Sequence, residues 1–269
     1  MAHVMLFDVG TVVGSVLAFF QGSSANGPLV HPPTGTADYV KFILRWSHFI
    51  FGITWIGILY FFNLINVPLM KALDGPTKGK VIPNLMPNAM WYFRWGAVGT
   101  VLVGLTYFAM YLLSVDARNG GYNGFTLLVI WLAIVLVTYA IIFFVIRPDG
   151  PTSNGNVLAV IIVVLVTAMS VAILFVLGGY DKVGNRSLCI GVGGGMGVIM
   201  LLNVWGIIWP AQKRIIAWTK ANAENGTPIP PEAAKLGRRA FLASRTNAWL
   251  SIPMLFFMAA AHDLPIFGR

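Results

Sequence analysis

Histidine offers the most specific chemistry in this sequence, because only four histidines occur among its 269 residues. His48 lies one helical turn after Arg45, and Gly52 and Trp55 continue the same helix face. A neutral imidazole can ligate haem iron, a glycine leaves room for the flat macrocycle, and an arginine toward water can pair with a propionate. This face therefore predicts one wall of a haem site. The alternative is a histidine that hydrogen-bonds between helices, with the glycine serving close packing.

A second histidine, His262, ends the last apolar segment and is followed by Asp263. Seventeen helical residues counted from Arg245 rise about 26 Å, which would bring His262 to the same membrane face as His48. The two histidines are therefore candidate axial ligands of one haem b. The alternative for His262 is an interfacial histidine that pairs with Asp263.

Other kinds of chemistry find little support in the residue types. The single cysteine, Cys189, cannot form a disulfide within the chain, and no CxxCH motif is present for covalent haem attachment. The glycine-rich stretch Gly191–Gly197 fails the GxGxxG spacing of a nucleotide loop, and its small-xxx-small pairs predict tight helix packing instead. No paired carboxylates or Ser-His-Asp set are evident, so hydrolysis has no candidate residues.

The elements that position these residues are predicted to be membrane helices. Apolar residues make up 57% of the chain and charged residues only 10%, whereas soluble proteins average about 25% charged residues. The sequence therefore predicts an all-α, polytopic membrane bundle of about seven helices in a single transmembrane domain, residues 1–269. The apolar segments are Val4–Phe20, Trp46–Leu69, Trp95–Val115, Phe125–Ile146, Val157–Gly178, Ser187–Trp209 and Thr246–Ala261.

The distribution of basic residues predicts the orientation. Twelve of the eighteen fall on one face, and the positive-inside rule makes that face cytoplasmic, with a cytoplasmic N-terminus and a periplasmic C-terminus in a bacterial inner membrane. The net charge of +9 thus reflects topology, and no nucleic-acid partner is expected. Two loops are long: residues 21–38 on the periplasmic side, and residues 210–245 on the cytoplasmic side. The second contains a predicted amphipathic helix at Pro231–Ser244.

Four stretches carry a resemblance to a known family: RWSHFIFGITWIGILYFFN, PNAMWYFRWGAVGTVLVGLTY, IIWPAQKRII and RAFLASRTNAWLSIPMLFFMAAAH. Together, from Tyr39 to Phe267, they resemble the membrane domain of the bacterial cytochrome-c-fused urate oxidase (urate hydroxylase) family. The resemblance implies seven or eight helices, oxidation of urate, and an outer-side cytochrome c that accepts electrons. The positions that match the family's motifs are Arg45, His48, Trp55, Arg94, Asn247 and His262.

The sequence departs from the family at two points. It reaches Arg269 without a CxxCH motif, so we expect the electron acceptor to be a separate protein. Thr246, in the run Ser244-Arg245-Thr246-Asn247, stands where the family pattern has a histidine, which argues against substrate oxidation.

Three functions follow, in order of preference. The first is a membrane redox subunit that binds haem b near the periplasmic face and passes electrons to a separate periplasmic cytochrome c. The second is a non-catalytic accessory subunit of a larger respiratory, photosynthetic or oxygenase complex. The third is a urate-oxidising enzyme that uses a separate cytochrome c. A reduced-minus-oxidised spectrum and a urate turnover assay distinguish them.

Overall fold

The computed structural model describes residue 14 and residues 35–267. The chain divides into two compact units, Met1–Phe42 and Ile43–Arg269. Apart from Gly14, the predicted first segment Val4–Phe20 lies outside the described residues, as do residues 21–34 of the predicted periplasmic loop. In the first unit a helix begins at Thr36, and its first turns carry an ion pair between Lys41 and Asp38 at 3.4 Å.

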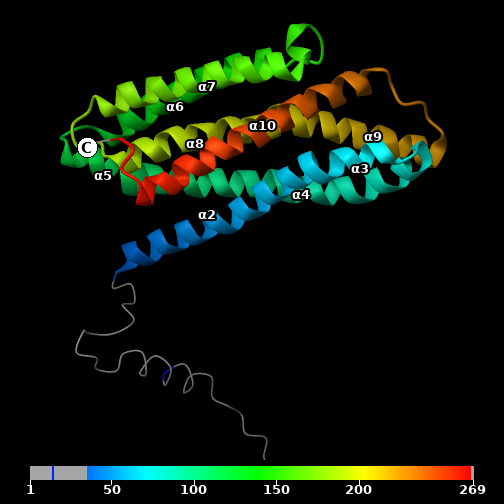
Figure 1. Cartoon of the computed structure of the whole chain (residues 1–269). Coiled ribbons are helices and arrows are strands. Elements are labelled where there is room, and N and C mark those ends of the chain that lie inside the picture. The colour runs from blue at the N-terminus through cyan, green and yellow to red at the C-terminus, as the bar shows by residue number, and fades with distance from the viewer. Residues whose placement is uncertain (1–13, 15–34, 268–269) are drawn as a thin grey trace, which may run out of the picture. The chain divides into compact units, whose positions relative to one another are not determined.

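The described residues form helices and no strands (Figure 1). Three long helices each contain a π-helical segment, so that each reads as α-helix, π segment and α-helix in turn. The α-helices are α2 (Thr36–Tyr60), α3 (Val67–Ala72), α4 (Gly75–Tyr107), α5 (Ser114–Asn119), α6 (Gly124–Val145), α7 (Gly155–Gly178), α8 (Asn185–Asn203), α9 (Trp209–Asn225) and α10 (Glu232–Asp263). The π segments are η1 (Phe61–Asn66), η2 (Phe108–Leu113) and η4 (Val204–Ile208), and a short 3₁₀ turn, η3, covers Pro151–Ser153.

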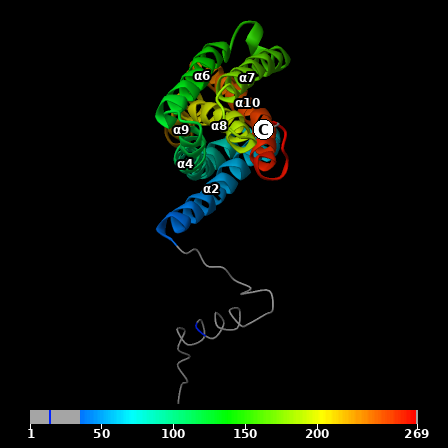
Figure 2. The same cartoon turned by 90° about the vertical axis from the view of Figure 1, so that its left-hand side faces the viewer.

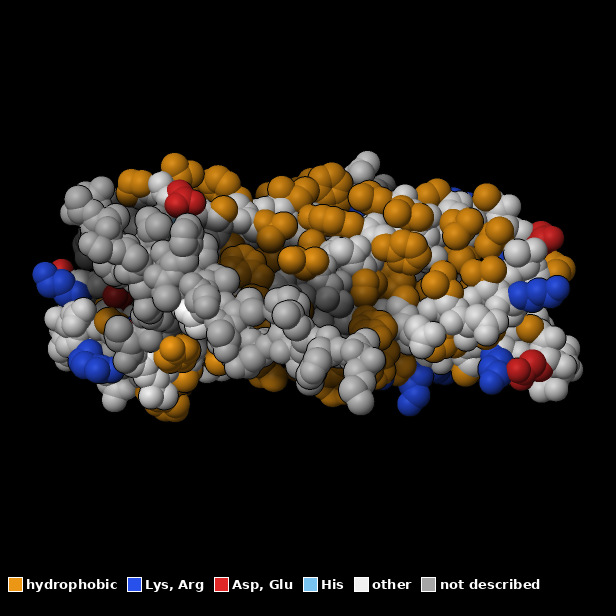
Figure 3. All heavy atoms as spheres, turned by 90° about the horizontal axis from the view of Figure 1, so that it is seen from below, with side chains coloured by type: hydrophobic (Ala, Val, Ile, Leu, Met, Phe, Trp, Pro, Cys, Tyr) orange, Lys and Arg blue, Asp and Glu red, His pale blue; other side chains and the backbone are white. Residues whose placement is uncertain are grey.

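Five continuous helices among the described residues are long and apolar enough to cross a membrane. They are Thr36–Ala72, Gly75–Asn119, Gly124–Val145, Gly155–Gly178 and Asn185–Asn225. They contain the five middle segments predicted from the sequence, except that Ile146, the last residue of one segment, lies just beyond its helix. The last predicted segment, Thr246–Ala261, lies in α10, which is not one of the five. Arg245, Asn247 and Ser251 lower its hydropathy. On the face seen in Figure 3, hydrophobic side chains gather over the middle of the helices, and Lys and Arg lie toward their ends.

Helix α8 is the central helix of the second unit. It contacts α4, α6, α7 and α10, and most of its residues are buried (Figure 2). Its glycines make this approach possible: Gly191 and Gly195 face Ile173 of α7, whereas Gly193 and Gly197 face Met254 of α10. The prediction that these small residues serve tight helix packing is confirmed.

The predicted loop 210–245 is largely helical. Helix α9 ends at Asn225, Gly226 takes the left-handed conformation (φ 67°) that commonly ends helices, and α10 begins at Glu232. The predicted amphipathic helix therefore continues without a break into the last apolar segment. No proline interrupts it before Pro253, and Arg239 donates hydrogen bonds to carbonyl groups at the end of α6, so this part of α10 packs on protein.

Candidate functional site

The α2 residues that were predicted to line a haem site do share one helix face, but this face packs against α4. The Nδ1 atom of His48 lies 2.9 Å from the carbonyl oxygen of Thr100. Its ring sits over Gly104, where an added Cβ would lie 2.7 Å from the imidazole Cε1. Gly52 faces the Thr100 side chain, and Trp55 is 0% exposed. An added Cβ on α4 at Gly96 would lie 3.3 Å from the Trp55 backbone nitrogen. The glycines of α4 thus let the bulky side chains of α2 approach.

His262, at the end of α10, lies between two arginines. The Nη2 atom of Arg186, from α8, is 3.0 Å from His262 Nδ1 and 3.2 Å from Nε2. The Nη2 atom of Arg45, from α2, is 3.5 Å from Nε2. Burial, Arg186 and Arg45, in that order of effect, lower the pKa of His262, while Asp263 raises it. We call Arg45, Arg186 and His262 the arginine–histidine cluster.

In this structure His48 and His262 have partners other than a haem. Each ring nitrogen of His262 has a guanidinium group beside it, which an iron ligand would have to displace. On α2, the positions predicted to receive the macrocycle, Gly52 and Trp55, instead pack on α4. Among residues 35–267, no group of three His, Cys, Asp or Glu side chains is arranged to hold a metal ion.

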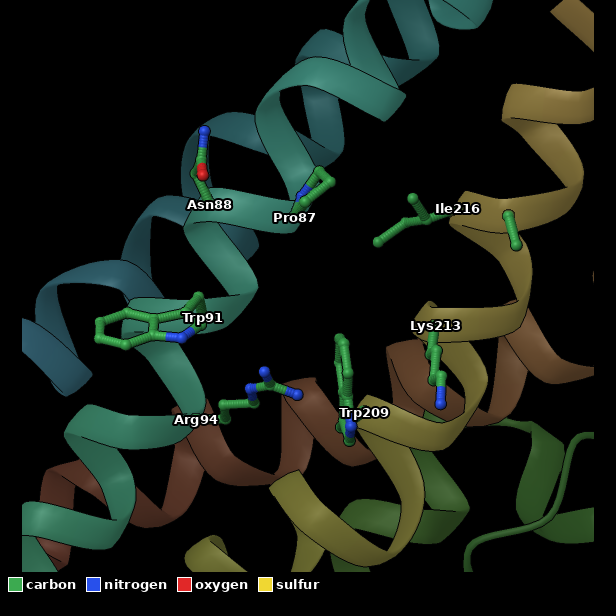
Figure 4. Close-up of a pocket in the computed structure, with 8 residues that line it drawn as sticks. Pro87, Asn88, Trp91, Arg94, Trp209, Lys213 and Ile216 are labelled. Atoms are coloured by element: carbon green, nitrogen blue, oxygen red, sulfur yellow. The ribbon is translucent and has the colours of Figure 1, made fainter.

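A pocket of about 410 Å³ lies between α4 and α9 (Figure 4). It is lined by Pro87, Asn88, Trp91, Arg94, Trp209, Lys213, Ile216 and Ala217. Arg94 of α4 and Trp209 of α9 point toward each other at one side of it. The pocket therefore combines two cations, an amide and aromatic rings, the set of groups that binds a flat anion.

Arg94 is held by aromatic rings. Its guanidinium carbon lies 3.9 Å from the ring centroid of Trp209 and 5.6 Å from that of Trp205, which are cation–π distances. The Trp205 indole N–H donates to the Arg94 carbonyl at 3.4 Å. Arg94 Nε is buried and has no hydrogen-bond partner among the described residues, and Arg94 forms no ion pair with any of them. A positive charge is thus fixed at the pocket wall with donor capacity to spare.

Helix periodicity brings the lining residues together. On α4, Pro87, Trp91 and Arg94 recur at spacings of four and three, so they share one face. On α9, Trp209, Lys213 and the residues one turn later do the same. Pro210 has no backbone N–H to continue the preceding helix, and the π segment η4 ends two residues before it, at Ile208.

Polar side chains of α10 form hydrogen bonds to α8 and α2. Asn247 accepts a hydrogen bond from Asn203 at 2.8 Å and donates to the Met200 carbonyl at 2.9 Å. Ser251, one turn along, pairs with Tyr60 at 2.9 Å. Asn203 and Asn247 are fully buried, so the prediction that they join helices is confirmed. Thr246, next to Asn247, is also buried and carries no ionisable group.

A comparison with known protein families shows which of these regions match a family model. Residues 72–268 match the family model described as Urate oxidase N-terminal. The chain belongs to this family. Both walls of the pocket lie inside the Urate oxidase N-terminal region, whereas Arg45 and His48 precede it. No curated protein and no solved structure matches the chain significantly.

Sequence reasoning placed Arg94 among the positions that match the Urate oxidase N-terminal family, but it missed the rest of the pocket. The signal was present: two of the four stretches that carry the resemblance each hold a tryptophan near a cation, Trp91 with Arg94 and Trp209 with Lys213. Their meeting could not be inferred, because the two walls come from helices more than a hundred residues apart in sequence.

Proposed function

We propose that the chain binds urate, or a closely related purine anion, in the α4–α9 pocket and oxidises it, passing electrons to a separate protein such as a cytochrome c. The observation that carries the proposal is the fixed guanidinium of Arg94 beside Trp209 and Lys213. The positive-inside rule supports a cytoplasmic location for this end of the bundle.

The chemistry of the anion matches the pocket. Urate at neutral pH is a flat monoanion whose charge is spread over ring atoms and oxygens, so it offers a face for stacking and an edge for hydrogen bonds. Trp91 and Trp209 supply rings, and Arg94, Lys213 and Asn88 supply donors. A volume of about 410 Å³ falls within the range of small-molecule sites, roughly 300–1,000 Å³.

The reaction balances only with an external acceptor. Oxidation removes two electrons from urate, water supplies the oxygen of the new hydroxyl group, and two protons are released. The electrons therefore need a partner protein to accept them. Thr246, which occupies the histidine position of the family pattern, cannot take up a proton at neutral pH, so binding and oxidation need separate tests.

Equilibrium dialysis of the purified full-length chain against radiolabelled urate tests binding. We expect saturable binding of one urate per chain, weakened about tenfold or more by Arg94→Gln, because a charged hydrogen bond is lost. Lys213→Gln, at an exposed position that tolerates replacement, should weaken binding as well. Lys235→Gln, an exposed lysine of α10 outside the pocket, is the matched control and should bind as the parent does.

Turnover with added oxidised cytochrome c tests the second part. Reduction of the cytochrome that depends on urate, and that falls in parallel with binding in Arg94→Gln, supports oxidation. Binding without reduction overturns oxidation and leaves urate recognition. Absence of specific urate binding by folded protein overturns the whole proposal in favour of the accessory subunit. The haem-binding redox subunit stays a separate prediction, which a reduced-minus-oxidised spectrum of the purified chain tests.

A further inference from the structure

We propose that the arginine–histidine cluster binds the phosphate group of an anionic phospholipid. The cluster lies at the His262 end of α10, whereas Glu232, at the other end of this 32-residue helix, forms an ion pair with Arg214 of α9. The proposal concerns residues outside the α4–α9 pocket, so it stands independently of urate binding.

The geometry gathers two guanidinium groups from different helices at one point. Both Nη2 atoms, of Arg45 and of Arg186, lie within hydrogen-bonding range of the same His262 nitrogen, Nε2. Their separation therefore cannot exceed the sum of those two distances, 3.5 and 3.2 Å. A phosphate, with several acceptor oxygens on one centre, can accept hydrogen bonds from both forks at once.

Nearby carboxylates do not neutralise the cluster. Neither arginine forms an ion pair with a described residue. Asp116 accepts hydrogen bonds from Ser187 Oγ at 2.6 Å and from the Gly184 backbone N–H at 3.2 Å, so its carboxylate serves the start of α8. Asp263 follows His262 in sequence but is paired with neither arginine. Two like charges held together without a counter-ion favour the binding of an anion.

The surroundings favour a lipid over a soluble anion. Arg45 is followed by Trp46, which is 58% exposed, and Phe49, one turn along, is 61% exposed. Leu264 and Ile266, just beyond His262, are also exposed. An exposed tryptophan beside a cation is typical of the headgroup region of a bilayer. Acyl chains can cover these apolar side chains, whereas free phosphate gains nothing from them.

Native mass spectrometry of the full-length chain in a neutral detergent, with added phosphatidylglycerol or phosphatidylcholine, tests the proposal. We expect one phosphatidylglycerol adduct that survives detergent release and a much weaker phosphatidylcholine adduct. Arg45→Gln/Arg186→Gln should weaken phosphatidylglycerol binding about tenfold or more, because two cations near the headgroup are removed. Arg118→Gln, an exposed arginine that follows α4 and η2 in α5, is the matched control and should retain the adduct.

Two further experiments, a double lysine variant and a competition with inorganic phosphate, distinguish the remaining explanations. Arg45→Lys/Arg186→Lys retains the charge without the planar forks and should restore part of the binding, which separates loss of the site from loss of folding. Competition with inorganic phosphate distinguishes the source of the anion, and complete displacement at equal concentration overturns the choice of a lipid. Equal retention of phosphatidylglycerol by the Gln double variant, or equal binding of phosphatidylcholine, overturns the site itself.

Discussion

At the scale of single residues, His262 illustrates how neighbours determine protonation. Desolvation and the guanidinium groups of Arg186 and Arg45 disfavour the imidazolium, and Asp263 offsets this only in part, so the pKa of His262 lies below that of a free histidine. This favours the neutral imidazole, whose one unprotonated nitrogen can accept a hydrogen bond from an arginine.

This gives a pH dependence with a definite sign. Because the folded-state pKa is below the unfolded-state value, the unfolded chain binds the proton more readily, and the stability contributed by neutral His262 is lost as pH falls from the unfolded pKa through the folded one. We expect an NMR titration in neutral detergent to give a depressed pKa for His262. Arg186→Gln should raise that pKa toward the ordinary value, and an unchanged pKa in this variant would contradict the assignment.

The position of the His48 ring depends on the absence of a side chain at Gly104. Gly104→Ala would place a methyl group 2.7 Å from its ring, so the imidazole must leave the Thr100 carbonyl or α2 must move away from α4. We expect a loss of about 1–3 kcal/mol in unfolding free energy, the usual cost of overpacking. Thermal unfolding in detergent measures it.

The control for this variant is Gly57→Ala, also in a helix, where an added Cβ meets nothing within 4 Å. It should be neutral or stabilising by about 0.5–1 kcal/mol, because alanine favours helix. Equal melting temperatures for the two variants would show that the contact between His48 and Gly104 does not hold the helices together.

At the scale of elements, α8 makes the second unit compact by presenting glycine to both sides. Gly193→Ala would bring a Cβ within 3.1 Å of Phe257 Cβ and 3.2 Å of the Met254 carbonyl oxygen, atoms that cannot move aside by changing rotamer. We expect α8 and α10 to separate slightly, at a cost of about 1–3 kcal/mol. The adjacent Gly194→Ala, with its nearest atom at 3.8 Å, should fold as well as the parent, and unfolding curves of the pair test the difference.

The sequence predicted some elements more fully than others. Runs of apolar residues identify the five helices that could span a membrane, and glycine spacing identifies how α8 packs. The sequence did not predict that α10 is one continuous helix. Its first half is charged and its second half is apolar, which is typical of two separate segments, but no residue between the two halves breaks a helix. The α2 face was identified, but its partner was not, since spacing along one helix does not say whether a cofactor or another helix covers it.

At the scale of the whole molecule, the distribution of basic residues predicts a direction across the membrane. Cysteine labelling can test it, because the chain has one cysteine, Cys189, and its side chain is fully buried. Asn119→Cys, at the last residue of α5, and Asn225→Cys, at the last residue of α9, are at exposed positions and leave the charge unchanged.

We expect an impermeant maleimide to label Asn119→Cys in intact bacteria and Asn225→Cys only after the cells are made permeable. The parent chain gives the background from Cys189. The reverse pattern would invert the orientation and place the α4–α9 pocket on the outer side.

The π segment before Trp209 sets the angular position of α9 about the helix axis. A π turn contains one residue more than an α turn, and each residue of an α-helix turns the chain by about 100°. If Val204–Ile208 became ordinary α-helix with all its residues kept, the extra residue would rotate Trp209 and Lys213 together by up to about 100°, away from Arg94. The pocket can therefore be lost with every lining residue still present, by a change of helix type alone.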